Sequence, residues 1–230
     1  MLTAAEIPPV LDAHCASAAR QPAGDHPDAP AALPDAALDF LVALARDLRA
    51  QRVFEFGSGR STAAFLRAGL AVVSLEDSTR WMQQTLDGLT AEERTRHTGL
   101  VRPLRLRWHG CAPVMDWRID AALAAHLAAA DLILVDSPYY APFREATLWS
   151  ALRHNGRAVV VLDDTRIPTL ARVCERLAGA NPGLLHSRVS LGHGFDLFSR
   201  LDTATPLRRA QSPLEVLKAW RRFLLSRRTA

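Results

Sequence analysis

The sequence predicts a doubly wound α/β domain with a mostly parallel sheet. Short apolar runs of strand length alternate along the chain with longer segments of helical periodicity. A Gly-x-Gly turn at residues 57–59 joins the first apolar run to a helix, as in the first βα unit of open α/β sheets. Near the end of the chain, two strand-like runs flank Gly192 and Gly194, which favours a hairpin that closes the sheet.

Length and composition indicate one large domain. A chain of 230 residues that is 49% hydrophobic can bury a substantial core. The cysteines Cys15, Cys111 and Cys174 are too widely spaced for a zinc site or a disulfide framework, so we expect a cytoplasmic protein. No segment has the roughly 20 apolar residues of a membrane span. The net charge of +4 is modest and gathers near the C-terminus, so no nucleic-acid partner is expected.

The first half of the chain contains the start of the sheet. A helix up to about Arg20 and an irregular connection over residues 21–34 precede it. Apolar residues at helical spacing over 37–48 then lead to the first strand, 53–56. The elements expected next are a helix over 63–68, a strand over 71–75 that ends at Glu76 and Asp77, a helix over 79–89 and a strand over 100–107.

The second half repeats the alternation. The expected elements are a helix over 119–129, a strand over 132–136, a helix over 143–152, a strand over 158–162, a helix over 169–177, and strands over 184–191 and 195–201. The runs at 132–135 and 158–162 are apolar throughout, as in strands buried on both faces.

A basic amphipathic helix is expected over residues 213–226. One side carries Leu214, Leu217, Trp220, Phe223 and Leu224. This side would dock against the domain or a second subunit in a homodimer, or else against a membrane surface or an acidic partner. The chain thus divides into residues 1–34, the main domain 35–201, and the C-terminal segment 202–230.

The glycine turn and two carboxylates predict the kind of ligand. Small residues let the backbone approach a ligand and present amides at the start of the next helix. Glu55, just before the turn, would repel a pyrophosphate but attract the ammonium of a methionine moiety. Glu76, at the end of the second strand, could accept both hydrogen bonds from a ribose diol.

These residues resemble the class I S-adenosylmethionine-dependent methyltransferases, through the segment Glu-Phe-Gly-Ser-Gly-x-Ser-Thr at 55–62. The resemblance covers residues 35–201 and implies a seven-stranded sheet with a C-terminal antiparallel hairpin. The cofactor-binding residues that it implies are Glu55, Gly57, Ser58, Gly59, Ser61, Thr62, Glu76, Asp77, Trp81 and Asp136. Trp81 would cover the adenine. The stretch 109–112, expected after the third strand, lacks the acidic residue with which many relatives bind the adenine amino group.

Three aspartates follow the fourth and fifth strands, where carboxylates repel one another unless a cation joins them. Asp136, Asp163 and Asp164 resemble the ligands of the magnesium-dependent O-methyltransferases, so the resemblance implies a Mg²⁺ ion that acidifies a hydroxyl of a small-molecule acceptor. Asp136, Tyr139 and Asp163 are the implied catalytic residues, with Tyr139 in the position of a lysine base. Alternatively, the aspartates cap a helix or bind loop amides.

Other interpretations stay open at this point. His109 and His193 lie in expected loops, where either could serve as a base. A NAD(P)-dependent oxidoreductase would also have the glycine turn and the acid after the second strand, but the usual third glycine is missing. A methyltransferase-like binding module without catalysis is the third possibility. The expected function is O-methylation of a hydroxylated small molecule.

Overall fold

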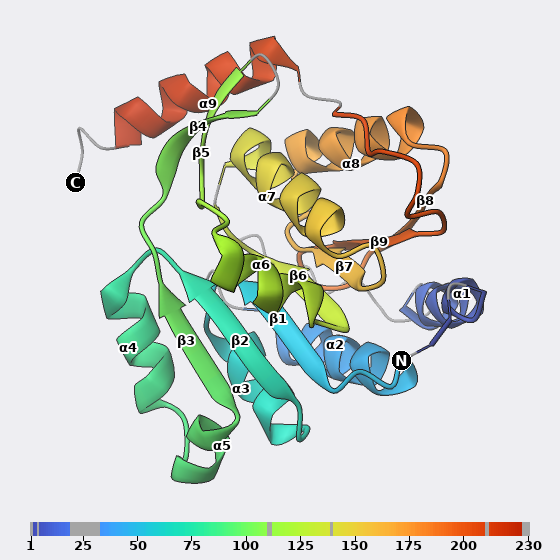
Figure 1. Ribbon diagram of the computed structural model, residues 1–230, viewed down its shortest axis with the longest axis vertical. Helices are drawn as coiled ribbons and strands as arrows, with labels where there is room; N and C mark the ends of the chain where they lie inside the picture. The colour runs from blue at the N-terminus through green and yellow to red at the C-terminus, as the bar shows by residue number, and fades with distance from the viewer. Residues whose placement is uncertain are drawn as a thin grey trace.

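The computed structural model describes residues 2–3, 5–18, 33–109, 112–138, 140–209 and 212–226. These residues form a seven-stranded sheet of order β3-β2-β1-β6-β7-β9-β8, with helices on both faces (Figure 1). Its strands are β1 (Arg52–Phe56), β2 (Ala71–Glu76), β3 (His97–Val101), β6 (Leu132–Val135), β7 (Val159–Leu162), β8 (Leu184–Val189) and β9 (Phe195–Arg200). The first five are parallel, whereas β9 is antiparallel to β7 and β8. The expected doubly wound sheet and its closing hairpin are confirmed.

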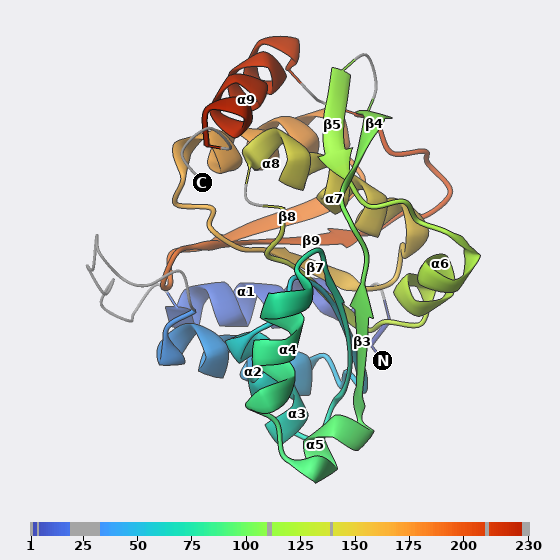
Figure 2. The same cartoon turned by 90° about the vertical axis from the view of Figure 1, so that its left-hand side faces the viewer.

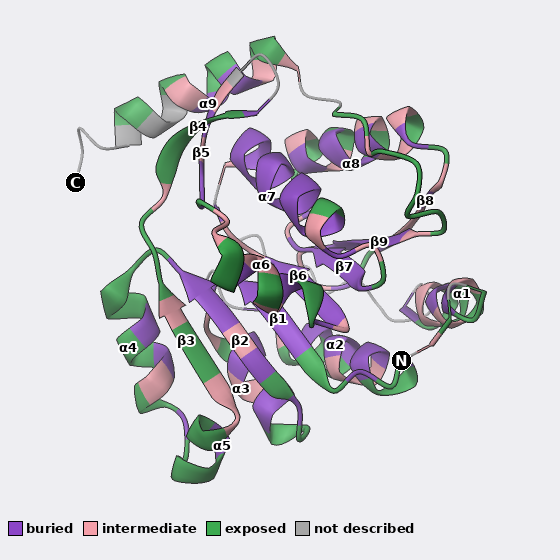
Figure 3. Ribbon diagram, viewed as in Figure 1, coloured by how far each residue is buried: buried purple, intermediate pink, exposed green. Residues whose placement is uncertain are grey.

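Alternating side chains along the buried strands form a core on each face of the sheet. Val53 of β1 faces one core, whereas Phe54 and Phe56 face the other. Figure 3 shows the central strands as buried. The helices are α1 (Ile7–Ala18), α2 (Asp35–Asp47), α3 (Arg60–Arg67), α4 (Thr79–Asp87), α5 (Ala91–Thr95), α6 (Ala121–Ala128), α7 (Ala141–His154), α8 (Pro168–Ala180) and α9 (Pro213–Ser226).

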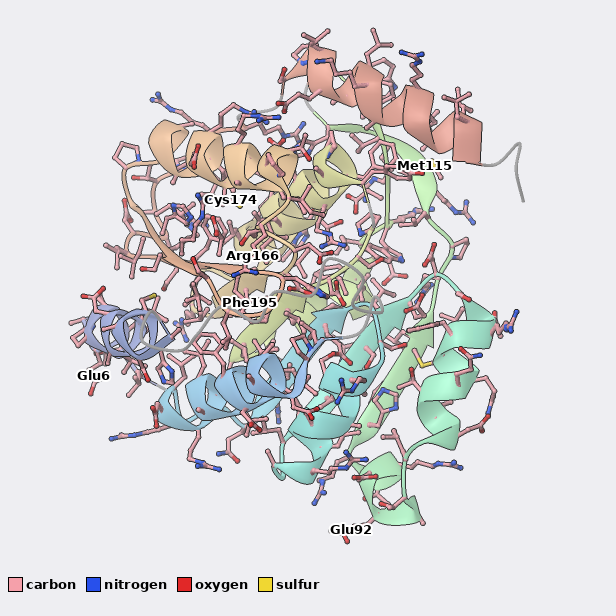
Figure 4. All side chains as sticks on the ribbon, turned by 180° about the vertical axis from the view of Figure 1, so that it is seen from behind. Glu6, Glu92, Met115, Arg166, Cys174 and Phe195 are labelled. Atoms are coloured by element: carbon pink, nitrogen blue, oxygen red, sulfur yellow. The ribbon has the colours of Figure 1, made fainter. Side chains whose placement is uncertain are left out.

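The two helical layers come from different parts of the chain. Helices α1, α2 and α3 supply one core, and α6, α7 and α8 supply the other. Phe195 of β9 stacks on Phe40 of α2 with ring centroids 5.7 Å apart, which ties the N-terminal layer to the closing hairpin (Figure 4). The short helix α5, which was not expected, begins with a capping box between Thr90 and Glu93.

The segment after β3 corrects the expectation of one strand over residues 100–107. Strand β3 ends at Val101, and a separate antiparallel hairpin follows, formed by β4 (Arg105–His109) and β5 (Ala112–Asp116). Pro103 lies in the break, where it cannot donate to a ladder. Figure 2 shows the hairpin standing above the sheet. His109 and Ala112 therefore pair with each other in this hairpin, and the stretch that follows the third sheet strand is 102–104.

The C-terminal helix forms over the expected residues, but of the side chains expected to dock only Trp220 is seen to do so. Val216, Ala219 and Trp220 pack against a cluster that includes Val114 and Phe143. Leu214, Leu217 and Leu224, expected on the docking side, are exposed. Val216 and Ala219 allow a closer approach to the domain than long side chains would, a difference that apolar periodicity does not report.

The position of α9 is also fixed by polar contacts. The Trp220 indole donates to the Pro113 carbonyl over 2.7 Å, and Met115 of the same hairpin lies close to this helix (Figure 4). The side chain of Phe223 lies outside the described residues. Within the described parts of the chain, no helix is both long and apolar enough to cross a membrane.

Candidate functional site

The glycine turn lies where the strand order of the sheet reverses. The chain leaves β1 toward β2 and β3, and later returns with β6 on the other side of β1. Gly57 has φ +105°, in the region that favours glycine, and a Cβ there would lie 3.6 Å from the Ser137 Cβ and 3.7 Å from the Asp136 Cβ. The turn is thus held against the end of β6, at the place where open α/β sheets bind ligands.

A cavity of about 790 Å³ opens beside this turn. Most of its lining comes from helices α2, α3 and α4. The lining also includes five residues that the sequence analysis assigned to the cofactor, Ser58, Gly59, Ser61, Trp81 and Asp136, whereas Gly57, Glu76 and Asp77 do not line it. Sites for small molecules typically measure about 300–1,000 Å³, so the cavity has a suitable size. The Trp81 indole, 49% exposed, donates from its ring nitrogen to the Ser58 carbonyl and forms part of the wall.

Glu55 makes its hydrogen bonds inside the protein. The side chain is fully buried, and its carboxylate accepts bonds from the hydroxyls of Ser61 (2.8 Å), Ser74 (2.6 Å) and Thr62. Burial raises the pKa of Glu55 to about 7, although the three hydroxyl bonds oppose that change. The Thr62 hydroxyl also accepts from the Gly59 amide, over 2.9 Å. Glu55 therefore anchors the start of α3 to β1 and β2 and fixes the shape of the turn.

Glu76 links the glycine turn to the loop after β2. One carboxylate oxygen accepts from the Ser58 amide (3.1 Å) and hydroxyl (3.3 Å), and the other accepts from the amides of Asp77 (3.0 Å) and Ser78 (3.1 Å). Burial raises the pKa of Glu76 to about 7. A carboxylate offers about four acceptor positions, so a ribose diol would replace bonds that Ser58 now makes.

The three predicted aspartates meet at the carboxyl ends of β6 and β7, together with a buried arginine that the sequence analysis missed. Arg144 of α7 is only 2% exposed, and its guanidinium lies 2.9 Å from Asp164 Oδ2 and 3.8 Å from Asp136 Oδ1. It also donates to the main-chain carbonyls of Pro138 (2.9 Å), Asp136 (2.5 Å) and Asp163 (3.2 Å). Little in the sequence signalled this role, because α7 also contains Glu145, Arg153 and His154.

Two of the aspartates, Asp136 and Asp163, influence each other's ionisation. Burial raises the pKa of Asp136 to about 6 and the pKa of Asp163 well above its usual value. The charges of Asp136 and Asp164 raise the pKa of Asp163 further. Arg144 lowers both pKa values in return. Two carboxyls in contact cannot readily both ionise, so the Asp136 and Asp163 pair titrates as one unit and holds a proton more tightly than free aspartates do.

Solved structures of methyltransferases resemble the fold of this protein over most of the chain. A methyltransferase from Geobacter sulfurreducens matches with a TM-score of 0.56 and 17% identity, over 84% of this chain and 90% of that one. The SAH-bound Podospora anserina methyltransferase has a TM-score of 0.55 and 14% identity, over 84% and 88%. The Bacillus cereus O-methyltransferase in complex with SAH has a TM-score of 0.51 and 17% identity, over 87% and 92%. This chain has the class I methyltransferase fold.

Sequence comparison adds nothing to this structural likeness, because no protein-family model and no curated protein matches the chain. At such low identities, the roles of residues in this methyltransferase fold must be argued from the site itself.

Part of the aspartate cluster fits a divalent cation. Asp163, Asp164 and His193 can each offer one ligand atom within 4.8 Å of the others. Asp163 Oδ1 is buried without a hydrogen-bond partner, and His193 Nδ1 lies 3.4 Å from Asp164 Oδ1. Carboxylate oxygens suit Mg²⁺, and imidazole suits transition metals. The ligand group differs from the expected one, because it contains His193 and does not contain Asp136.

Two candidate residues remain, Tyr139 and His109. Tyr139 falls outside the described residues. His109 is buried in the β4–β5 hairpin, where it lines a separate cavity and not the one beside the glycine turn. The alternative that made His109 the base of this site is therefore wrong, because the hairpin carries it away from the sheet.

Proposed function

We propose that the chain is an S-adenosylmethionine-dependent methyltransferase that methylates a hydroxyl group of a small molecule. The observation that carries this proposal is the cavity beside the glycine turn, bordered by Trp81 and Asp136 at the reversal point of the sheet. The structural neighbours from Podospora anserina and Bacillus cereus carry SAH according to their descriptions.

The proposed cofactor site uses the turn and the two strand ends beside it. The backbone of residues 57–59 would receive the methionine part, with Ser61 and Thr62 at the start of α3 beside it. Glu76 would bind the ribose after releasing Ser58, with Asp77 next to it, and Trp81 would cover the adenine. Buried Glu55 would act mainly through the shape of the turn and through its negative field toward the ammonium and sulfonium charges.

The proposed chemistry is an in-line displacement, in which the protein mainly holds the acceptor near the methyl carbon. The Asp136 side chain is 38% exposed and borders the cavity, so it can reach the acceptor and take the hydroxyl proton on a carboxylate oxygen. Asp163 would lie in the same carboxylate cluster as Asp136, and Arg144 would offset the negative charge of the cluster. Tyr139 stays a candidate for orienting the acceptor.

A divalent cation is part of the proposal, held by Asp163 and Asp164 with His193 as an additional ligand. When bound, such an ion would lower the pKa of an acceptor hydroxyl. Asp136, expected from the sequence to be a ligand, is assigned to proton transfer here because its carboxylate is not part of the group formed by Asp163, Asp164 and His193 and it borders the cavity.

The sheet favours a methyltransferase over the oxidoreductase alternative. Dinucleotide-binding sheets of the 3-2-1-4-5-6 order are parallel throughout, whereas antiparallel β9 stands here between β7 and β8. Calorimetric titration with S-adenosylmethionine, SAH and NADH tests this choice. We expect the first two to bind and NADH not to bind; binding of NADH alone would reject the proposal.

The acceptor requires a second experiment. Hydroxylated small molecules can be screened for those that make the protein convert S-adenosylmethionine to SAH, with Asp136→Asn as the inactive comparison. Cofactor binding without turnover on any acceptor would instead support a binding module.

A further inference from the structure

A second cavity, of about 200 Å³, lies between the β4–β5 hairpin, the second half of α7 and the segment after β9. Its lining shares no residue with the cavity beside the glycine turn. Three separate parts of the chain contribute an arginine to it, namely Arg107, Arg153 and Arg209. In Figure 2, the hairpin and α7 stand together above the sheet. The cavity therefore exists only in the folded chain.

The three arginines give the lining of the cavity a net positive charge. Among the described residues, none of the three forms an ion pair with a carboxylate. The guanidinium carbons of Arg209 and Arg153 lie 4.2 and 5.1 Å from the ring centroid of Trp149, so both cations are held beside the same indole. Cations gathered in a recess attract anions.

The one carboxylate in the lining is already engaged. Asp116 accepts from the Trp117 amide (2.8 Å) and from the Thr147 hydroxyl (3.0 Å). Arg107 donates to the Trp117 carbonyl over 2.5 Å and is therefore fixed at the mouth of the hairpin. Burial raises the pKa of Asp116 to about 6, whereas its hydrogen bonds and Arg107 oppose that change, so near neutral pH the carboxylate is mostly ionised and offsets one of the three arginine charges.

Two buried ring nitrogens, on residues that line the cavity, lack a hydrogen-bond partner among the described residues. His109 and Trp149 are 4% and 9% exposed, and both His109 Nε2 and Trp149 Nε1 are buried without a hydrogen bond. The indole N–H can only donate, and buried donors in native proteins nearly always have an acceptor. Burial and then Arg209 lower the pKa of His109 to about 4, so the ring is neutral and can offer one N–H. The Trp149 N–H therefore calls for an acceptor, and His109 Nε2 has an unused hydrogen-bonding position.

We propose that this cavity binds a small oxyanion, the phosphate or carboxylate group of a small molecule. Arginine forks bind phosphate and carboxylate oxygens in pairs, and the Trp149 N–H supplies a further donor. The volume is below the range of about 300–1,000 Å³ of larger ligand sites, which favours a ligand with few atoms. The site does not depend on methyl transfer.

Calorimetric titration of the full chain with inorganic phosphate, glycerol phosphate and citrate tests the proposal. We expect one binding event per chain and a loss of about tenfold or more in affinity in both Arg153→Gln and Arg209→Gln. Arg157→Gln is the matched control, because Arg157 is exposed and lies outside the cavity. Trp149→Phe, which keeps the ring and removes the donor, should weaken binding less but measurably.

The three probes distinguish the source of the oxyanion. Equal affinity for phosphate and glycerol phosphate indicates a site for the free ion, whereas tighter binding of the ester or of citrate indicates a larger ligand. An unchanged thermal unfolding temperature shows that each variant is folded. The proposal is overturned if none of the probes binds at millimolar concentration, or if binding survives in Arg153→Gln and Arg209→Gln, or if Arg157→Gln loses as much.

Discussion

The guanidinium of Arg144 lies 2.9 Å from Asp164 Oδ2 and donates at the same time to the main chain after β6. A fully buried cation thereby joins the ends of β6 and β7, the two strands that border the proposed acceptor site. The contact explains how three carboxylates can lie together in this fold, since Arg144 supplies positive charge from within the protein.

Arg144→Gln should lower the free energy of unfolding by about 1.5–3 kcal/mol, because it removes a buried cation and its hydrogen bonds to three main-chain carbonyls. Chemical denaturation with urea measures this change. Arg157→Gln removes an exposed arginine and should change stability by less than about 0.5 kcal/mol. Equal effects of the two substitutions would show that the buried pairing contributes little.

Glu76→Gln should weaken binding of S-adenosylmethionine by about 1–3 kcal/mol, because the amide cannot accept all of the bonds that a carboxylate accepts. Calorimetry of the variant gives the value. Asp87→Asn, at the exposed end of α4, removes a carboxylate without touching the turn and serves as the control. If Glu76→Gln binds the cofactor as wild type does, the ribose assignment is wrong.

Glu55 should make the protein less stable as the pH rises from about 5 to 8. Its pKa is about 7 in the folded chain and 4.5 in a free group, so the folded state binds more protons in this range. The stabilisation is complete below pH 4.5 and is lost as the pH rises through 7. Glu55→Gln should therefore gain about 2–3 kcal/mol relative to wild type between these pH values.

Denaturation at several pH values measures this slope for Glu55→Gln. Glu92→Gln, on exposed α5, controls for the charge removed. A pH-independent difference between Glu55→Gln and wild type would contradict the raised pKa.

Removal of divalent cations should lower turnover much more than cofactor affinity, and Asp163→Asn should do the same. The defect should shrink as the pH approaches the pKa of the free acceptor hydroxyl, because the ion then has less to contribute. Turnover with EDTA, followed by addition of Mg²⁺, measures the effect. Full activity in EDTA and in Asp163→Asn would remove the cation from the mechanism and leave Arg144 as the only countercharge proposed for the cluster.

Truncation after Thr205 should lower the thermal unfolding temperature, because it uncovers Phe143 and Val114 beneath α9. It also removes Glu215, whose carboxylate lies 2.7 Å from Arg176 of α8. Leu217→Gln alters the exposed side of α9 and should leave stability unchanged. Liposome flotation and light scattering of this second variant test membrane or subunit contacts, and an unchanged unfolding temperature in the truncated chain would contradict the docking role.

The sequence alone determined the βα order, the glycine turn and the carboxylates at the strand ends. Each of these depends on local patterns, because strand periodicity and turn chemistry involve neighbouring residues. Since parallel strands end at one edge of a sheet, Glu76, Asp136 and Asp163 could be assigned to one site before their contacts were known. The break at Pro103 was a local signal too, but its consequence, a separate hairpin, depends on pairing with residues 112–116.

Only the tertiary structure decided which groups satisfy one another. Arg144 contacts Asp164 although the two lie 20 positions apart in the sequence. Arg107, Arg153 and Arg209 come from three segments of the chain and line one cavity. Such contacts depend on how each helix is rotated about its axis and docked. The periodicity of apolar residues does not determine that rotation closely enough to predict them. The same reason explains why α9 docks through Val216, Ala219 and Trp220, while Leu214, Leu217 and Leu224 are exposed. Packing selects the face that fits most closely, and that fit exists only between folded surfaces.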